Sequence, residues 1–186
     1  KLTIALLLKK LVNKKDEIDK VHFENELKLV INKIDEVFAN IRRITSDLRP
    51  DLLERLGLID SVNWLVENFE QKFGVESKVY ISGNDSGLDS KTSLALYRIL
   101  QELLTNISVH SKAGKGEVSL IINDEAVVLS VKDNGKGIDT NKIDDSRSIG
   151  IIGIKERAYR LGGEVTFYSS ENSGTECRVV IPIKKS

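Results

Sequence analysis

Three polar residues at helical spacing, Glu102, Asn106 and His110, are the first candidates for chemistry in this chain. Residues four apart fall on nearly the same face of an α-helix, and these three lie at the edge of an apolar stripe instead of opposite it. The stripe consists of Leu96, Ile99, Leu100, Leu103, Leu104 and Ile107. This pattern predicts a helix that packs on a sheet while its polar rim opens into a ligand cavity. There the amide oxygen of Asn106 suits a magnesium ion, and Glu102 can orient or deprotonate an attacking group.

A glycine-rich segment, Asp133-Asn134-Gly135-Lys136-Gly137-Ile138, follows one predicted hairpin later. Its glycines allow a tight turn that a flat ligand can approach. Asp133, at the end of a buried strand, can accept a hydrogen bond from an exocyclic amine such as that of adenine. Such a bond to a charged group contributes about 1.5 to 3 kcal/mol, enough to select adenine over bases without this donor. Taken alone, Asp-Asn-Gly favours a plain turn.

A second glycine motif, Gly150-Ile151-Ile152-Gly153, stands directly before a predicted helix. Free backbone N–H groups and the helix dipole at such a position favour phosphate. A lone Gly-x-x-Gly is weak evidence, since it more often marks a loop-to-helix junction. His110 and Lys112 are further candidates for phosphate contacts, although His110 could as easily end its helix through the dipole.

The length of 186 residues and the 40% hydrophobic content permit one domain or two small ones, and we predict two, at 1–50 and 51–186. Lys plus Arg and Asp plus Glu both count 28, which argues against nucleic acid as a partner. The single cysteine, Cys177, excludes an internal disulfide and fits a reducing compartment. No apolar run reaches the roughly 18 residues that a membrane span needs.

The first predicted domain is a helical hairpin. Its second helix has an apolar seam at heptad spacing, made of Leu27, Val30, Ile34, Val37, Ile41, Ile44 and Leu48. Two helices close a poor core alone, so we expect a homodimer that forms a four-helix bundle. The alternative, that the hairpin packs on its own globular domain, stays open. Leu48-Arg49-Pro50 should end the long helix and begin a linker or hinge, because proline disfavours helical geometry in the residue before it.

The second predicted domain mixes helices with antiparallel hairpins. We expect helices at 58–73, from Asp89 or Ser90 to about 110, and within 150–161, and strands at 78–81, 117–122, 126–132, 164–168 and 176–183. The polar segment 139–149 should be a mobile loop. This arrangement is an α+β fold, a two-layer α/β sandwich, and not a doubly wound parallel sheet.

These motifs together resemble the ATP-binding domain of sensor histidine kinases, within the group that includes Hsp90, MutL and type II topoisomerases. The segment 102–106 with His110 is similar to the N box, 133–138 to the first glycine box, and Gly150 with Gly153 to the second. Gly174-Thr175 is similar to the last box, whose threonine supports adenine recognition. Four motifs in this order are far more specific than any one of them.

The N-terminal part narrows the resemblance to the NarX/DesK-like subfamily. The features that carry it are Leu48-Arg49-Pro50, Leu56-Gly57-Leu58, the short loop before Gly-Ile-Ile-Gly-Ile-Lys-Glu-Arg, and Leu161-Gly162-Gly163. This resemblance implies a dimerisation and histidine-phosphotransfer hairpin at 1–50 and a Bergerat-type ATP-binding catalytic domain at 51–186. Mg-ATP would then donate its γ-phosphoryl group to a histidine, and an aspartate in the receiver domain of a response regulator would receive it.

The resemblance also assigns residues and partners. Glu102 and Asn106 would be catalytic, Asn106 would hold magnesium, and segment 139–149 would order over ATP as a lid. The implied nucleotide contacts are Asn106, His110, Lys112, Asp133, Gly135, Gly137, Ile138, Gly150, Ile151, Gly153 and Thr175. The partners would be a second copy and the regulator, with no nucleic acid, and the chain would be the cytoplasmic portion of a sensor whose membrane anchoring is left open.

One feature departs from the subfamily. Its acceptor histidine lies near the start of the first hairpin helix, and Lys1-Leu2-Thr3-Ile4-Ala5 matches the segment directly after that histidine motif, so we expect the acceptor a few residues before Lys1. His22 falls at the wrong end of the hairpin to replace it. Two other functions stay open. The first is a related ATPase or anti-sigma-type serine kinase, which would leave the N-terminal heptads unexplained. The second is a non-catalytic dimeric scaffold, which would leave the polar motif residues unexplained.

Overall fold

The computed structural model describes residues 50–138, 149–170 and 173–183, all within a unit that spans Pro50–Ser186. The predicted hairpin with its heptads lies outside the described residues, and so does nearly all of the loop predicted at 139–149. Those predictions, and the domain boundary at residue 50, therefore stay predictions.

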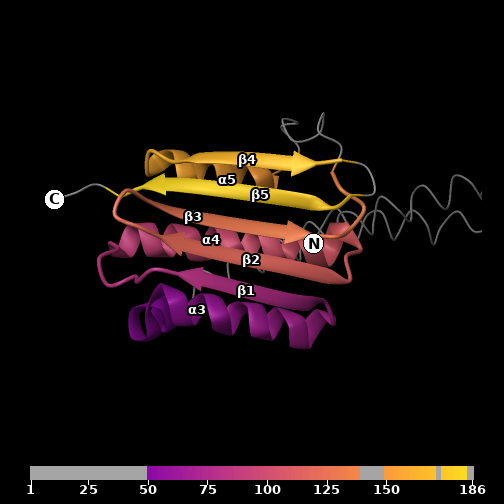
Figure 1. The fold of residues 1–186 in the computed structure, drawn as a ribbon, viewed down its shortest axis with the longest axis horizontal. Coiled ribbons are helices and arrows are strands. Elements are labelled where there is room, and N and C mark those ends of the chain that lie inside the picture. The colour runs from indigo at the N-terminus through magenta and orange to yellow at the C-terminus, as the bar shows by residue number, and fades with distance from the viewer. Residues whose placement is uncertain (1–49, 139–148, 171–172, 184–186) are drawn as a thin grey trace, which may run out of the picture. The chain divides into compact units, whose positions relative to one another are not determined.

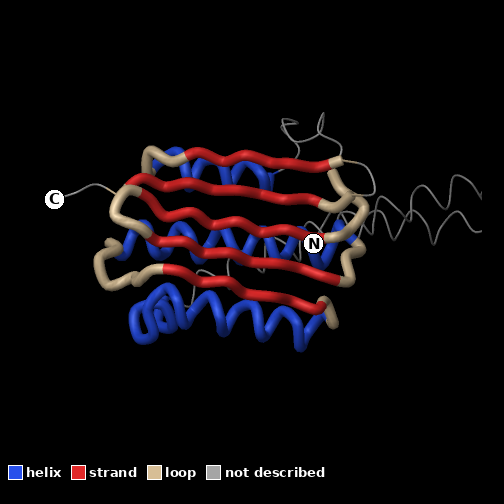
Figure 2. Tube along the Cα trace, in the orientation of Figure 1, coloured by secondary structure: helices blue, strands red, loops and turns tan. Residues whose placement is uncertain are grey.

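The described residues form a five-stranded mixed sheet with helices (Figures 1 and 2). The elements are α3 (Pro50–Phe73), β1 (Glu76–Ser82), α4 (Ser90–Asn106), η1 (Ile107–Ser111), β2 (Lys115–Ile122), β3 (Ala126–Asp133), α5 (Ile149–Arg160), β4 (Glu164–Ser169) and β5 (Thr175–Pro182). The strand order is β1-β2-β3-β5-β4. β1 pairs parallel with β2, and the other neighbours are antiparallel.

The core lies between the sheet and the helices. In Figure 1, α4 and α5 lie behind the sheet and α3 lies along its β1 edge. Alternate residues of the central strands are buried, as expected for strands with one face on a core. The buried strand residues are Val118, Leu120, Ile122, Val127, Leu129, Val131, Cys177, Val179 and Ile181. The predicted two-layer α+β sandwich is therefore confirmed, and Cys177 is a small core residue.

α4 begins where the sequence predicts a helix start. Asp89 is the N-cap, and its Oδ1 accepts the N–H groups of Lys91 and Thr92, both at 2.9 Å. All six residues of the predicted apolar stripe are buried. The helix extends as far as predicted, but its last part is the π-helix η1, whose wider turn carries His110.

The prediction of a linker from Pro50 onward is wrong, because a helix begins at Pro50. The helical geometry is interrupted instead at Gly57, inside α3, where φ is 79° and ψ is 178°. The second part of the helix is capped from a distant loop: Asp85 Oδ2 accepts the N–H groups of Leu58 at 2.7 Å and Ile59 at 3.0 Å. Among the described residues, no helix is long and apolar enough to cross a membrane.

Candidate nucleotide site

Asp133 is a buried carboxylate at the end of β3. It is only 6% exposed, and it pairs with Gly116 of β2 on one side and Thr175 of β5 on the other. Its Oδ1 accepts the N–H of Gly135 at 2.7 Å, and the backbone of Thr175 also bonds to the carboxylate. Burial raises the pKa of Asp133, although both hydrogen bonds act in the opposite direction. A carboxylate in such surroundings is a candidate for ligand recognition.

The glycines after Asp133 are required by close backbone contacts. A Cβ at Gly135 would collide with the carbonyl oxygen of Ser111, and a Cβ at Gly137 would collide with that of Ser170. Gly137 also has a positive φ of 79°, which side chains rarely adopt. The turn therefore lies flat against the end of η1 and the end of β4.

Three neighbouring segments hold this turn in place. The N–H of Lys136 donates to the carbonyl of Ser111 at 2.8 Å. Asn134 Oδ1 accepts the N–H groups of Gly114 at 3.0 Å and Lys115 at 2.9 Å. The N–H of Ile138 donates to Ser169 Oγ at 2.7 Å. The Asp-Asn-Gly turn is thus a junction between η1, β2 and β4, and not only the plain turn that these three residues favour when taken alone.

The rim of α4 meets the start of α5. A Cβ at Gly150 would collide with Glu102 Oε1, so the Glu102 carboxylate lies directly against the first turn of α5. The first N–H groups of a helix have no partner inside it and carry the positive end of the dipole. The structure thus brings together the half-buried Glu102 and the second glycine motif at the positive end of the α5 dipole.

The remaining predicted site residues differ in exposure. Asn106, the last residue of α4, is half-buried, whereas His110 and Lys112 are exposed at and just after the end of η1. Ile151 is 8% exposed, so its side chain is buried. The backbone of Gly153 lies close to the guanidinium of Arg157, because a Cβ there would be 2.7 Å from Nη1.

Sequence reasoning missed Ser111 and Ser169, which support the glycine turn through a carbonyl and a hydroxyl. Neither serine stands in a motif, and single serines between helices and strands carry no distinctive pattern. For Ser169 a weak signal exists, because it ends the strand that precedes Gly174-Thr175.

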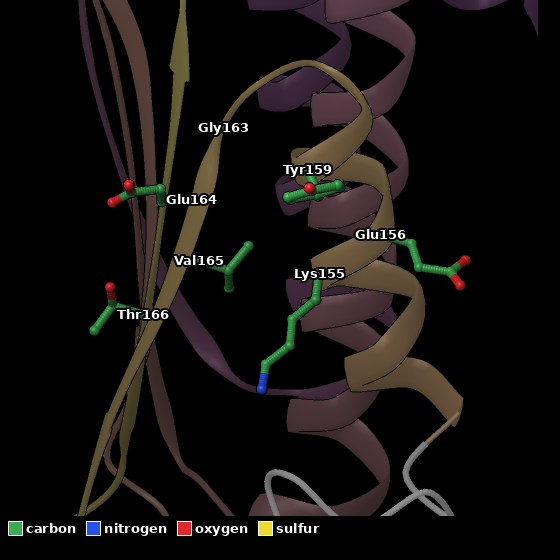
Figure 3. Close-up of a pocket in the computed structure, with 7 residues that line it drawn as sticks. All are labelled: Lys155, Glu156, Tyr159, Gly163, Glu164, Val165 and Thr166. Carbon is green, nitrogen blue, oxygen red and sulfur yellow. The ribbon is translucent and has the colours of Figure 1, made fainter.

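One surface pocket lies away from these residues. Figure 3 shows this shallow pocket of about 500 Å³ between α5 and β4, and none of the predicted site residues line it. A second pocket, of about 480 Å³, includes Ser169, Gly174 and Thr175 among its walls and so borders the glycine turn. We place the nucleotide site by its chemistry, since a ligand also needs polar groups that converge on it.

Metal binding would depend on few protein atoms. Among the residues that the structure describes, no three His, Cys, Asp or Glu side chains are grouped to hold a metal ion. Magnesium is commonly held by one or two protein oxygens together with substrate phosphates, so the amide oxygen of Asn106 fits that chemistry.

A buried strand-end carboxylate, glycine turns pressed against neighbouring backbone, and a rim carboxylate at a helix start define a nucleotide-binding domain. Residues 91–185 match the family described as histidine kinase-, DNA gyrase B- and HSP90-like ATPases. The chain belongs to this family, which confirms the predicted resemblance and makes the domain an ATP-binding one. The individual roles of the site residues stay predictions.

Relatives and solved structures agree with this family. The chain is 34% identical over 145 residues to the signal transduction histidine-protein kinase/phosphatase DegS of Brevibacillus brevis, covering 78% of this chain and 37% of DegS. It is 34% identical over 169 residues to the sensor histidine kinase LiaS of Bacillus subtilis (strain 168), covering 91% of this chain and 46% of LiaS. The chain thus spans less than half the length of either relative.

The fold is also similar to that of a solved histidine kinase. AdeS of Acinetobacter baumannii matches with a TM-score of 0.61 at 16% identity, over 99% of this chain and 95% of that structure. At this identity the likeness shows the fold alone.

Proposed function

We propose that the chain is the catalytic core of a two-component sensor histidine kinase. It binds Mg-ATP and transfers the γ-phosphoryl group to a histidine, from which an aspartate of a response regulator receives it. The observation that carries the proposal is the buried Asp133 carboxylate, held by backbone N–H groups beside glycines that admit no side chain. The relatives DegS and LiaS are named as histidine kinases, and these names support a histidine as the acceptor of the phosphoryl group.

Adenine recognition rests on Asp133. The ionised carboxylate accepts a hydrogen bond from the exocyclic amine, and the N–H groups of Gly135 and Thr175 keep its oxygens in position. Gly135 and Gly137 keep the turn close to its neighbours, which leaves the space beside it to a flat base. Thr175, beside Asp133 in the β3–β5 ladder, supports the same edge of the base.

The phosphates bind at the start of α5. Backbone N–H groups of Gly150 and Ile151, in the first turn of α5, donate to phosphate oxygens, and Gly153 lies one turn further along the helix. The exposed His110 and Lys112 add side-chain contacts, with a positive charge from Lys112. Asn106 would hold the magnesium ion, which neutralises phosphate charge when bound.

Glu102 acts on the phosphoryl acceptor. Its carboxylate lies against Gly150, next to the phosphate cradle, and from there it orients the acceptor imidazole or takes its proton. The rate enhancement then comes from positioning and charge stabilisation, since phosphoryl transfer needs little other chemistry from the protein.

The partners follow from the same proposal. The heptads within 1–50 would pair two copies through a four-helix bundle, and the receiver domain of a response regulator would take the phosphoryl group. A cytoplasmic location fits both partners.

Transfer of labelled γ-phosphate from ATP within the full-length protein tests the proposal. Acid-labile, alkali-stable label is expected, because phosphohistidine hydrolyses in acid. Acid-stable label would indicate a serine or threonine kinase, release of free phosphate would indicate an ATPase, and ATP binding with neither would indicate a scaffold. Any of these three results would overturn the kinase assignment.

A matched pair of variants isolates Glu102. We expect Glu102→Gln to lower the transfer rate about 100-fold or more with little change in ATP affinity, since a positioned acid or base contributes about 10² to 10⁴. Glu125→Gln also removes one negative charge, but from the exposed turn between β2 and β3. It should change neither the transfer rate nor the ATP affinity.

A further inference from the structure

We infer that Ser169 is a positioning residue for adenine. Its hydroxyl connects the first glycine turn to Gly174-Thr175 by hydrogen bonds and determines the acceptor to which the Thr175 hydroxyl donates its proton. The inference rests on the proposed function only in taking ATP as the ligand. It adds a residue outside all four motifs and a physical basis for the preference of adenine over guanine.

The hydroxyl of Ser169 joins two segments that follow different strands. Its oxygen accepts the N–H of Ile138 at 2.7 Å, where the glycine turn ends. Its proton is donated to the carbonyl of Gly174 at 3.0 Å. Ser169 is half-buried, so the hydroxyl replaces water as the partner of both backbone groups. The end of β4 thereby locks the glycine turn to the start of β5.

The Ser169 hydroxyl also determines the direction of its hydrogen bond with the Thr175 hydroxyl. Ser169 Oγ and Thr175 Oγ1 are 3.2 Å apart, and geometry alone allows either to donate. A hydroxyl has a single proton, and that of Ser169 is already donated to Gly174, whose carbonyl can only accept. Thr175 is therefore the donor to Ser169, and its remaining lone pairs can only accept.

Two acceptors then stand side by side in the β3–β5 ladder. Thr175 is the partner of Asp133, and its backbone N–H bonds to the Asp133 carboxylate. A Cβ at Gly174 would collide with the Asp133 carbonyl, so the two strands are in direct contact at this point. An edge made only of acceptors matches the exocyclic amine of adenine and repels the carbonyl that guanine has at the equivalent position.

Replacing Ser169 by alanine tests this inference. The Ile138 N–H loses its partner, and the Thr175 proton becomes free to turn toward a guanine carbonyl. We expect ATP affinity, measured by titration calorimetry, to fall about tenfold, which equals about 1.4 kcal/mol. GTP affinity should fall less or rise, so the ATP-to-GTP ratio narrows.

Two controls separate positioning from general stability. Ser169→Thr keeps the hydroxyl and should restore both the affinity and the ratio. Ser170→Ala removes an exposed neighbouring hydroxyl and should change neither. If the Ser169→Ala protein does not fold, Ser169→Cys keeps the volume with a weak donor and acceptor and should narrow the ratio in the same direction.

Several results would overturn the inference. One is an unchanged ATP-to-GTP ratio in Ser169→Ala, with or without an equal loss of both affinities. Another is a Ser169→Thr protein that behaves like the alanine variant. Failure of the wild-type protein to bind ATP would instead contradict the proposed function. That result comes from the wild type alone, so it is distinguishable from a failure of the Ser169 inference, which comes from the variants.

Discussion

β3 has an asparagine-containing turn at each end, and the two turns are held in different ways. Before β3, Asn123 Oδ1 accepts the N–H groups of Glu125 at 2.9 Å and Ala126 at 2.8 Å, both within three residues. After β3, Asn134 Oδ1 accepts N–H groups from residues 20 and 19 positions earlier in the chain, Gly114 and Lys115. The asparagine side chain of the first turn therefore bonds within its own turn, whereas that of the second turn bonds to a distant segment of the chain.

The difference extends to charge and packing. Asn123, Asp124 and Glu125 are exposed, so their polar groups remain hydrated. At the other end Asp133 is buried with a raised pKa, and glycines press against neighbouring backbone. Burying a carboxylate is unfavourable unless it is well hydrogen-bonded, and a plain turn has no need of it. These differences support our proposal that the turn after Asp133 is the one that binds a ligand.

The largest expected effect separates the two turns by function. Asp133→Asn turns an acceptor oxygen into a donor, so ATP affinity should fall by about tenfold to over a hundredfold, the equivalent of about 1.5 to 3 kcal/mol. Asp124→Asn makes the same change in the exposed turn and should leave affinity unchanged. Titration calorimetry measures both, and normal ATP binding by Asp133→Asn would remove the adenine assignment.

The next effect concerns packing at the site end of the sheet. Gly174 has a φ of 78°, and a Cβ there would collide with the Asp133 carbonyl. Gly174→Ala should lower the free energy of unfolding by about 2 kcal/mol, because alanine is strained at positive φ and the ladder must shift. Gly87→Ala is the control, since a Cβ at Gly87 meets nothing within 4 Å. Equal urea midpoints for the two variants would contradict the close contact.

Local patterns were enough to predict most elements. The apolar stripe of α4, the Asp89 cap and the strands on either side of 123–125 follow from periodicity and turn chemistry that act within a few residues. The parallel pairing of β1 with β2 and the position of β5 between β3 and β4 depend on long-range contacts, which no local pattern encodes. The break at Gly57 is held by Asp85, 27 residues away from Leu58, and was missed for the same reason.

The residues of the candidate site also fall into those that local patterns predict and those that depend on long-range contacts. Asp133 and its glycines could be predicted because their types and spacing are unusual. Ser111 and Ser169 could not, because a carbonyl and a single hydroxyl gain meaning only when the fold brings them to the glycine turn. The π-helical turn of η1, which leaves His110 exposed, also lies beyond a prediction that assumes a regular helix.

A smaller effect tests the two asparagines directly. Asn134→Ala leaves two N–H groups of the β2 start without their partner, so stability should fall by about 1 kcal/mol and ATP affinity should fall with it. Asn123→Ala also removes two hydrogen bonds, but local ones in an exposed turn, and should cost a few tenths of a kcal/mol to about 1 kcal/mol without affecting ATP. Reduced ATP affinity in Asn123→Ala would mean that the two ends of β3 are coupled.

The smallest effect is a pH dependence that contrasts the buried Asp133 with the capping Asp89. Hydrogen bonds from the Thr92 side chain and backbone lower the pKa of Asp89 from its ordinary 3.8. The stability it contributes is therefore present above pH 3.8 and is lost as the pH falls through its lower folded value. Asp89→Ala should lose about 1 kcal/mol at neutral pH, as for other N-caps, and progressively less in acid.

Asp133 should behave in the opposite way. Because burial raises its pKa, the folded state holds this proton more tightly than the unfolded chain, and stability falls as the pH rises from 3.8 through the folded value. As the pH rises, the stability of the wild type relative to Asp133→Asn should therefore decrease above pH 3.8, while its stability relative to Asp89→Ala should increase below pH 3.8. Urea unfolding from below the lowered pKa of Asp89 to above the raised pKa of Asp133 measures both slopes, and slopes of the same sign would show that hydrogen bonding, not burial, dominates at Asp133.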